Sequence, residues 1–113
     1  MNRSDLTCRC GCGQNNATDD LVSVLTAMED EMGEGLTITS GCRCTDHNIA
    51  EGGSPTSSHL YGLAADIQVT GDSHRFEIME TAMMFGITRI GVARTFVHVD
   101  VDPDKTQNVM WVY

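Results

Sequence analysis

The chain has 113 residues, which is enough for one domain built on a single hydrophobic core but not for two. It is 41% hydrophobic and 20% charged, as is typical of soluble globular proteins, and no run of 18 apolar residues could span a membrane. Sixteen acidic and seven basic residues give a formal net charge of −9. The sequence has no basic stripe of the kind that nucleic-acid binders carry, and the acidic charge disfavours contact with anionic membranes, so we expect neither partner.

The N-terminal segment, residues 1–18, is polar and rich in Cys, Gly and Asn, which predicts an irregular arm. The five cysteines of the chain form two groups, which are Cys8, Cys10 and Cys12 in the arm, and Cys42 and Cys44 beyond it. The favoured interpretation is a disulfide that cross-links the arm to the body of the protein, with one thiol left over. A structural zinc site with thiolate ligands is the alternative, although Cys-x-Cys is tighter than the usual Cys-x2-Cys spacing. A third interpretation of the cysteines is a redox centre.

The pattern becomes helical after Thr18. Apolar side chains recur at helical spacing after an acidic start, and two glycines follow them, so we predict a helix over residues 19–32. Residues 36–39 alternate apolar and polar, which indicates a half-buried strand. A short helix is expected over residues 46–51, and the Gly- and Ser-rich residues 52–58 indicate a loop.

The second half of the chain predicts one long helix among strands. Residues 64–69 favour a strand, and Asp72 or Ser73 can cap a helix that Gly86 ends. Residues 87–92, 95–101 and 109–112 then favour three short strands. Because short turns join these last strands, we expect a small antiparallel sheet with packed helices, an α+β fold formed by residues 1–113 as a single domain.

Two histidines and two carboxylates stand out as candidate metal ligands. His98 and Asp100 lie two residues apart in a predicted strand, so their side chains share one face while the intervening valines face the core. His59 precedes another predicted strand, and Asp66 lies within that strand. Two imidazole nitrogens and a carboxylate oxygen suit Zn²⁺ and leave one position open for water. The alternative is that these are ordinary structural histidines, and the spacing alone leaves it open.

Three segments resemble a known family. Residues 57–66 carry Ser-x-His-x-x-Gly-x-Ala-x-Asp, which resembles the signature of the zinc D-Ala-D-Ala carboxypeptidases and peptidoglycan endopeptidases of peptidase family M15. Residues 40–43, Ser-Gly-Cys-Arg, resemble the Ser-Gly-Tyr-Arg segment of the family, with Cys42 in place of the tyrosine. Residues 96–100 resemble its closing metal-ligand strand. The resemblance spans residues 36 to about 113.

This resemblance implies a hedgehog/DD-peptidase-like fold in which His59, Asp66 and His98 hold Zn²⁺. In many members a catalytic acid lies three residues before the last histidine, but Thr95 occupies that position here. Asp100, on the same strand face as His98, is instead the candidate that accepts a proton from water and passes it to the leaving amine, as the resemblance to short members ending in His-x-Asp implies.

The resemblance also implies roles in substrate binding. Arg43 is expected to stabilise the oxyanion or to hold a substrate carboxylate, and Ser57 to bind substrate or orient a ligand.

The expected function is zinc-dependent hydrolysis of peptidoglycan stem peptides by a monomer, at either the D-Ala-D-Ala or the L-Ala-D-Glu bond. The alternative is a non-catalytic zinc-binding module of the same fold, which Thr95 supports. The first eight residues lack the apolar core of a signal peptide, so we expect either export by another system, such as holin release of a phage endolysin, or a bacterial enzyme from which the leader has been removed. The site of action would be the cell wall, in the periplasm or outside the cell.

Overall fold

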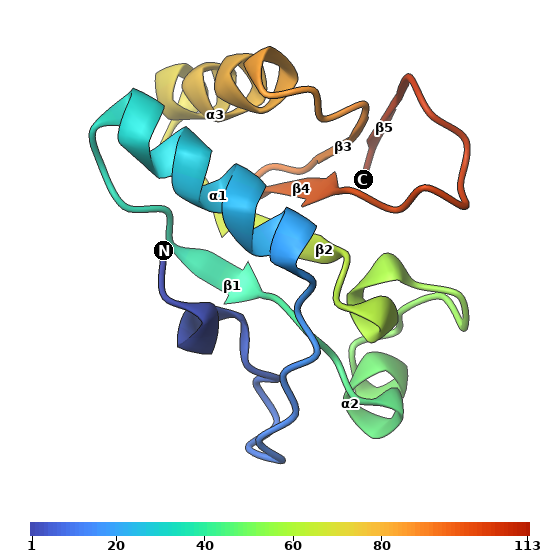
Figure 1. Ribbon diagram of the computed structural model, residues 1–113. Coiled ribbons are helices and arrows are strands. Elements are labelled where there is room, and N and C mark those ends of the chain that lie inside the picture. The colour runs from blue at the N-terminus through green and yellow to red at the C-terminus, as the bar shows by residue number, and fades with distance from the viewer.

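The structure of the protein is a computed structural model that describes residues 1–113 (Figure 1). A five-stranded sheet forms its centre, with the strands in the order β1-β2-β4-β3-β5. The strands are β1 (Ile38–Ser40), β2 (Ala64–Gln68), β3 (Arg89–Val92), β4 (Phe96–Asp100) and β5 (Val109–Val112). The pairs β1–β2, β2–β4 and β3–β4 are antiparallel, whereas β3–β5 is parallel.

The sheet is therefore mixed, and the prediction of an antiparallel sheet was wrong for its last strand. The α+β class itself is confirmed. Both edges of β4 are already paired, one with β2 and the other with β3. The strand that reverses direction after β4 pairs at the free edge of β3, and because β3 is antiparallel to β4 it runs parallel to β3 there.

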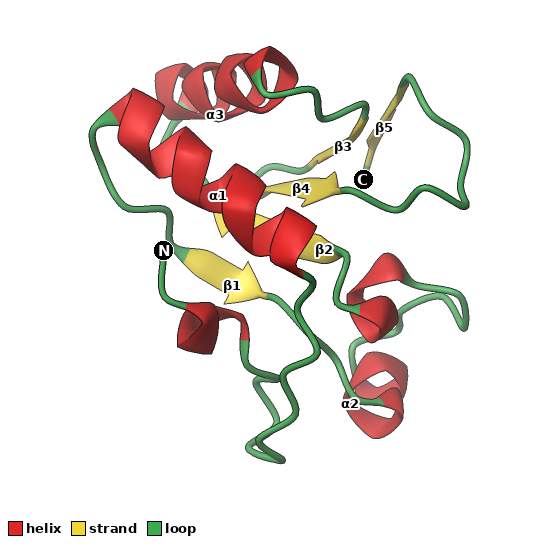
Figure 2. Cartoon of the chain, viewed as in Figure 1, coloured by secondary structure: helices red, strands yellow, loops and turns green.

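Three helices accompany the sheet (Figure 2). They begin and end within one or two residues of the predicted positions. They are α1 (Asp19–Met32), α2 (Thr45–Ala50) and α3 (Asp72–Met84). The Thr18 hydroxyl accepts a hydrogen bond from the backbone N–H of Leu21 and so caps α1, which ends at Gly33 in the left-handed region. Two short 3-10 helices, η1 (Arg3–Leu6) and η2 (Ser58–Tyr61), were not predicted.

Helices α1 and α3 cover one face of the sheet (Figure 1). Their apolar side chains pack against alternate residues of the strands, including the fully buried Val97 and Val99 of β4. The intervening residues of β4 therefore point to the opposite face. None of the helices combines the length and the apolar character that crossing a bilayer requires.

The N-terminal arm is attached to the body by packing and hydrogen bonds. Leu6 is fully buried in the core, and its carbonyl accepts a hydrogen bond from the backbone N–H of Cys42 at 2.8 Å. The predicted disulfide is not present, because all five cysteines are free. Burial of Leu6 and backbone pairing hold the arm in place instead.

Candidate metal centre

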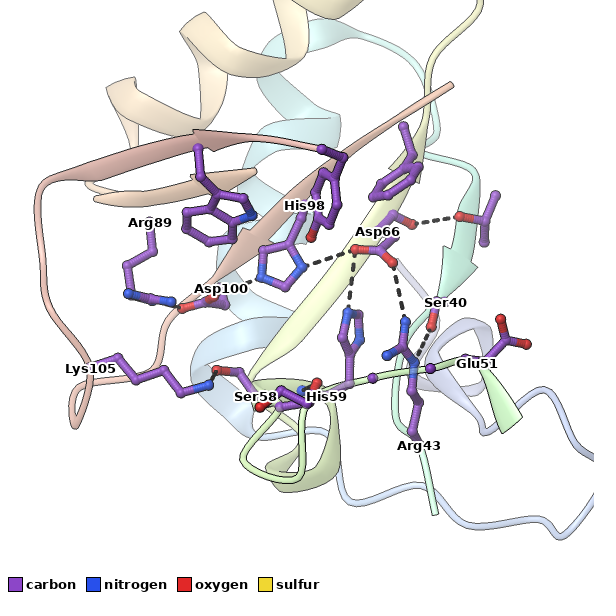
Figure 3. Close-up of a pocket in the computed structure, with 18 residues that line it drawn as sticks. Ser40, Arg43, Glu51, Ser58, His59, Asp66, Arg89, His98, Asp100 and Lys105 are labelled. Atoms are coloured by element: carbon purple, nitrogen blue, oxygen red, sulfur yellow. Dashed lines mark hydrogen bonds and ion pairs between the residues drawn. The ribbon is translucent and has the colours of Figure 1, made fainter. Parts of the chain in front are cut away.

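Three buried ligand groups converge on the sheet face opposite α1 and α3 (Figure 3). The His59 Nε2 atom lies 3.3 Å from Asp66 Oδ1, and the His98 Nδ1 atom lies 3.0 Å from the same oxygen. The two imidazole rings meet edge to face at a centroid distance of 5.1 Å. The structure thus brings together the three residues predicted as metal ligands.

The pairing of β2 with β4 positions two of these ligands. Asp66 lies directly opposite His98 in the antiparallel register, so both side chains emerge on the same face and close together. The neighbouring Ala65 and Ile67 point into the core on the other face. A one-residue slip of either strand would move its ligand to the wrong face of the sheet.

The loop before β2 positions the third ligand. The Ser57 hydroxyl accepts a hydrogen bond from the His59 backbone N–H and caps η2. The helix ends at Gly62, whose φ is +69° and whose absent Cβ would lie only 1.9 Å from the Asn16 carbonyl oxygen. Only glycine satisfies both conditions, so the serine and the glycine of the signature serve to place His59.

A hydrogen bond from the second ring nitrogen of each histidine orients its imidazole. The His59 Nδ1–H donates to the Gly41 carbonyl at 2.7 Å, and the His98 Nε2–H donates to Asp100 Oδ2 at 2.7 Å. Each ring therefore directs its other nitrogen toward Asp66. Such outer hydrogen bonds fix the tautomer and the orientation of metal-binding histidines.

The donor set fits a divalent zinc ion. Ligand bonds of about 2.0–2.2 Å in a tetrahedral arrangement separate neighbouring ligand atoms by roughly 3.3 Å. The observed nitrogen–oxygen separations of 3.3 and 3.0 Å are close to that value. One buried carboxylate with two imidazoles is also a common ligand set for catalytic zinc.

The charged groups of the cluster shift each other's protonation. Burial alone would raise the pKa of Asp66, but hydrogen bonds from His59 and His98 outweigh burial and hold this pKa well below its usual range. Burial opposes protonation of His98, yet its bonds to Asp100 and Asp66 raise its pKa. Burial likewise works against ionisation of Asp100, whose pKa is nevertheless lowered by His98 and Arg89. Both carboxyl groups are thus held as carboxylates.

A polar pocket of about 690 Å³ opens over the cluster. Only three of its eighteen lining residues are hydrophobic, and three cations, Arg43, Arg89 and Lys105, are among the others. A pocket of this size and polarity suits a peptide segment with charged groups.

A family model described as Peptidase M15 matches residues 1–100. The chain belongs to the M15 peptidase family. The match confirms the family that the motifs indicated and extends it to the N-terminal arm, which the motif comparison did not cover. A search among curated proteins finds no match to the chain.

The other predicted residues of this M15 chain lie at the pocket, each with protein partners. Arg43 Nη2 lies 3.5 Å from Asp66 Oδ2, and its Nε donates to the Ser40 hydroxyl at 3.0 Å. Both Asp100 oxygens are engaged, Oδ2 by His98 and Oδ1 by Arg89 Nε at 2.7 Å. The roles assigned to Arg43, Ser57 and Asp100 in binding or proton transfer stay predictions.

Sequence reasoning missed Arg89 and Lys105, which line the pocket wall together with Trp111. Arg89 pairs with Asp100, Lys105 Nζ donates to the Ser58 hydroxyl at 2.9 Å, and the Trp111 ring lies 5.2 Å from the His98 ring. Arg89 reaches the site because β3 pairs with β4, whereas Trp111 reaches it because β5 pairs with β3, a connection that the sequence did not reveal. Arg89 is a basic residue in a predicted strand, and the carboxylate of Asp100 in the next predicted strand was the only sign in the sequence that the two could pair.

Gly91→Ala is expected to disturb this wall while leaving the fold intact. A Cβ at residue 91 would lie 2.6 Å from Trp111 Nε1 and 2.8 Å from Tyr113 Cε2, both in side chains near the C-terminus that can move. We expect a stability loss of about 1 kcal/mol and a displaced Trp111. Because Trp111 is the only tryptophan, its fluorescence measures the displacement directly. An unchanged emission spectrum would contradict the packing described here.

Proposed function

We propose that the protein is a zinc-dependent hydrolase of peptidoglycan stem peptides that acts as a monomer at the cell wall, as a phage endolysin does. The cut bond is D-Ala-D-Ala or L-Ala-D-Glu. Membership of the M15 family supports peptidase activity. The observation that carries the proposal is the convergence of three buried ligand atoms beneath an open polar pocket.

His59, Asp66 and His98 would hold the metal, which supplies Lewis-acid activation of water and of the scissile carbonyl. Hydrolysis adds one water across the peptide bond and yields a carboxylate and an amine. The chain must therefore bind the peptide, orient its carbonyl and move one proton from water to the leaving nitrogen. Arg43, whose guanidinium lies 3.5 Å from Asp66 Oδ2, would act on the carbonyl oxygen, and Asp100 would accept the proton.

The distribution of charge supports an anionic substrate. The chain has a net charge of −9, yet three of its seven basic residues line this one pocket. Stem peptides carry carboxylates at D-Glu and at the terminal D-Ala. Three cations in the wall of this polar pocket favour such groups over neutral peptides.

Digestion of purified muropeptides by the zinc-loaded protein tests the proposal. Loss of a single alanine from a pentapeptide stem identifies a carboxypeptidase. Separation of the muramoyl-alanine part from the rest of the stem identifies an L-Ala-D-Glu endopeptidase. Mass spectrometry of the fragments distinguishes the two, and intact muropeptides from every wall type would overturn the proposal.

A non-catalytic zinc-binding module is the second candidate. Thr95 stands where many relatives carry the catalytic acid, and both oxygens of Asp100 already accept hydrogen bonds from the protein. A wild-type protein that binds zinc at His59 but releases no fragment would favour this candidate.

Arg43→Lys is expected to lower kcat/KM about tenfold without loss of the metal. The guanidinium contacts Ser40, Asn48 and Asp66 at once through three different nitrogens, and a lysine ammonium cannot reproduce that fork. Steady-state kinetics on the cleaved muropeptide measure the loss, and zinc content measured in parallel shows whether the site is intact. Arg94→Lys, an exposed change outside the pocket, is the matched control.

A further inference from the structure

Four of the five cysteines gather at a second place in the molecule. The sulfurs of Cys8, Cys10, Cys12 and Cys44 all lie within 4.8 Å of one another. Cys8 is buried, Cys44 is half-buried, and the other two are exposed. Three of the sulfurs come from the arm, and the fourth comes from the residue that caps α2.

The spacing of the sulfurs matches metal ligation better than a disulfide. The Cys8–Cys10 and Cys10–Cys44 sulfur separations are 3.5 and 3.6 Å. Four Zn–S bonds of about 2.3 Å in a tetrahedron place neighbouring sulfurs roughly 3.8 Å apart, whereas a disulfide joins them at about 2.05 Å. Each Cys-x-Cys pair lets the arm turn back so that three sulfurs face the fourth.

Backbone N–H groups point at three of the sulfurs. The N–H of Cys44 donates to Cys8 Sγ at 3.4 Å, that of Gln14 to Cys12 Sγ at 3.4 Å, and that of His47 to Cys44 Sγ at 3.3 Å. Such bonds stabilise negative charge on sulfur, which four thiolates around one cation require. Ordinary buried thiols are weak acceptors and need no such set of donors.

We propose that Cys8, Cys10, Cys12 and Cys44 bind one structural Zn²⁺ ion in a closed four-sulfur site, separate from the His59–Asp66–His98 cluster. A site with four protein ligands leaves no position for water, so its role is to hold the chain together. The alternative interpretation of the cysteines made from the sequence thus replaces the disulfide.

The proposed site would fix the backbone behind the candidate active site. Cys44 adjoins Arg43, and the carbonyl of Arg43 accepts a hydrogen bond from the Gln14 side chain of the arm at 3.3 Å. Gly41, which orients His59, packs so closely on Leu6 that a Cβ would lie 2.7 Å from its backbone. A metal that anchors residues 8–12 to residue 44 would therefore hold Gly41 and Arg43 in position.

Metal content per chain tests this inference independently of peptidase activity. We expect two zinc ions in the wild type, one in Cys10→Ser/Cys12→Ser and one in His59→Ala. Cys42→Ser is the matched control, because the Cys42 sulfur contacts Asn15 instead of the cluster and its loss should leave two ions bound. Cys10 and Cys12 are exposed, so their replacement spares the core, and circular dichroism checks the fold.

Cobalt substitution shows which ligands each ion has. Thiolate-to-cobalt charge-transfer absorption should persist in His59→Ala and disappear in Cys10→Ser/Cys12→Ser. A single zinc in the wild type, lost on His59→Ala and kept in the double serine variant, would overturn the inference, as would disulfides found by mass spectrometry of the unreduced protein. If the protein binds two ions but cleaves no peptide, the proposed peptidase fails while this site stands.

Discussion

His59→Ala is expected to remove one zinc ion and to reduce stem-peptide hydrolysis to background. His59 supplies one of the three converging ligand atoms, and alanine leaves a carboxylate and a single imidazole to hold the ion. Two protein ligands do not make a catalytic zinc site of the usual three. Metal analysis of the purified variant and digestion of muropeptides measure both losses.

His74→Ala is the matched control for this experiment. His74 is partly exposed on α3, where its Nδ1 accepts a hydrogen bond from the backbone of Thr70, and it lies outside the pocket. Its replacement should leave both metal content and hydrolysis unchanged. Full hydrolysis by His59→Ala would show that the cluster is not the active site, and full metal content would show that His59 is not a ligand.

Local sequence patterns predicted most of the elements because each pattern has a local physical cause. The helix over residues 19–32 follows from its apolar spacing, its acidic first turn and its terminal glycine, all of which the structure contains. The predicted shared face of His98 and Asp100 follows from strand geometry alone. The two 3-10 helices were missed because so short a turn leaves no periodicity to recognise.

Contacts between distant segments were not predictable from the same patterns. The parallel pairing of β5 with β3 depends on which strand edges remain free once β4 has paired, and no local residue encodes that. The arm is a similar case. Its cysteines suggested a cross-link, but the meeting of Cys44 with three arm sulfurs depends on the backbone bond between Leu6 and Cys42. The residue types in the sequence indicated the metal ligands, whereas the pairing of distant segments determined which residues lie around those ligands.

Asp100→Asn is expected to weaken zinc binding about 10–100-fold, because Asp100 orients a ligand. Its carboxylate accepts hydrogen bonds from three donors, which are His98 Nε2, Arg89 Nε and the Asp102 backbone N–H. An amide has one acceptor oxygen, so either His98 or Arg89 would face an NH₂ group. If the NH₂ group faces His98, the imidazole moves its proton to Nδ1, the atom directed at Asp66. Competition with a zinc-binding dye measures the affinity, and Asp104→Asn, an exposed change nearby, is the control.

Kinetics at saturating zinc separate this orienting role from proton transfer. If Asp100 acts by holding His98, excess zinc should restore most of the hydrolysis by Asp100→Asn. If Asp100 is the proton acceptor, the variant should bind zinc almost normally and stay inactive however much zinc is added, since an amide cannot take up the proton. Glu51 is the remaining carboxylate of the pocket, with 54% of its side chain exposed and a weak pairing to His47 at 3.6 Å. Restored activity in Asp100→Asn together with a loss in Glu51→Gln would therefore assign proton transfer to Glu51 at the end of α2, which lies on the opposite side of the ligand cluster from Arg89 (Figure 3).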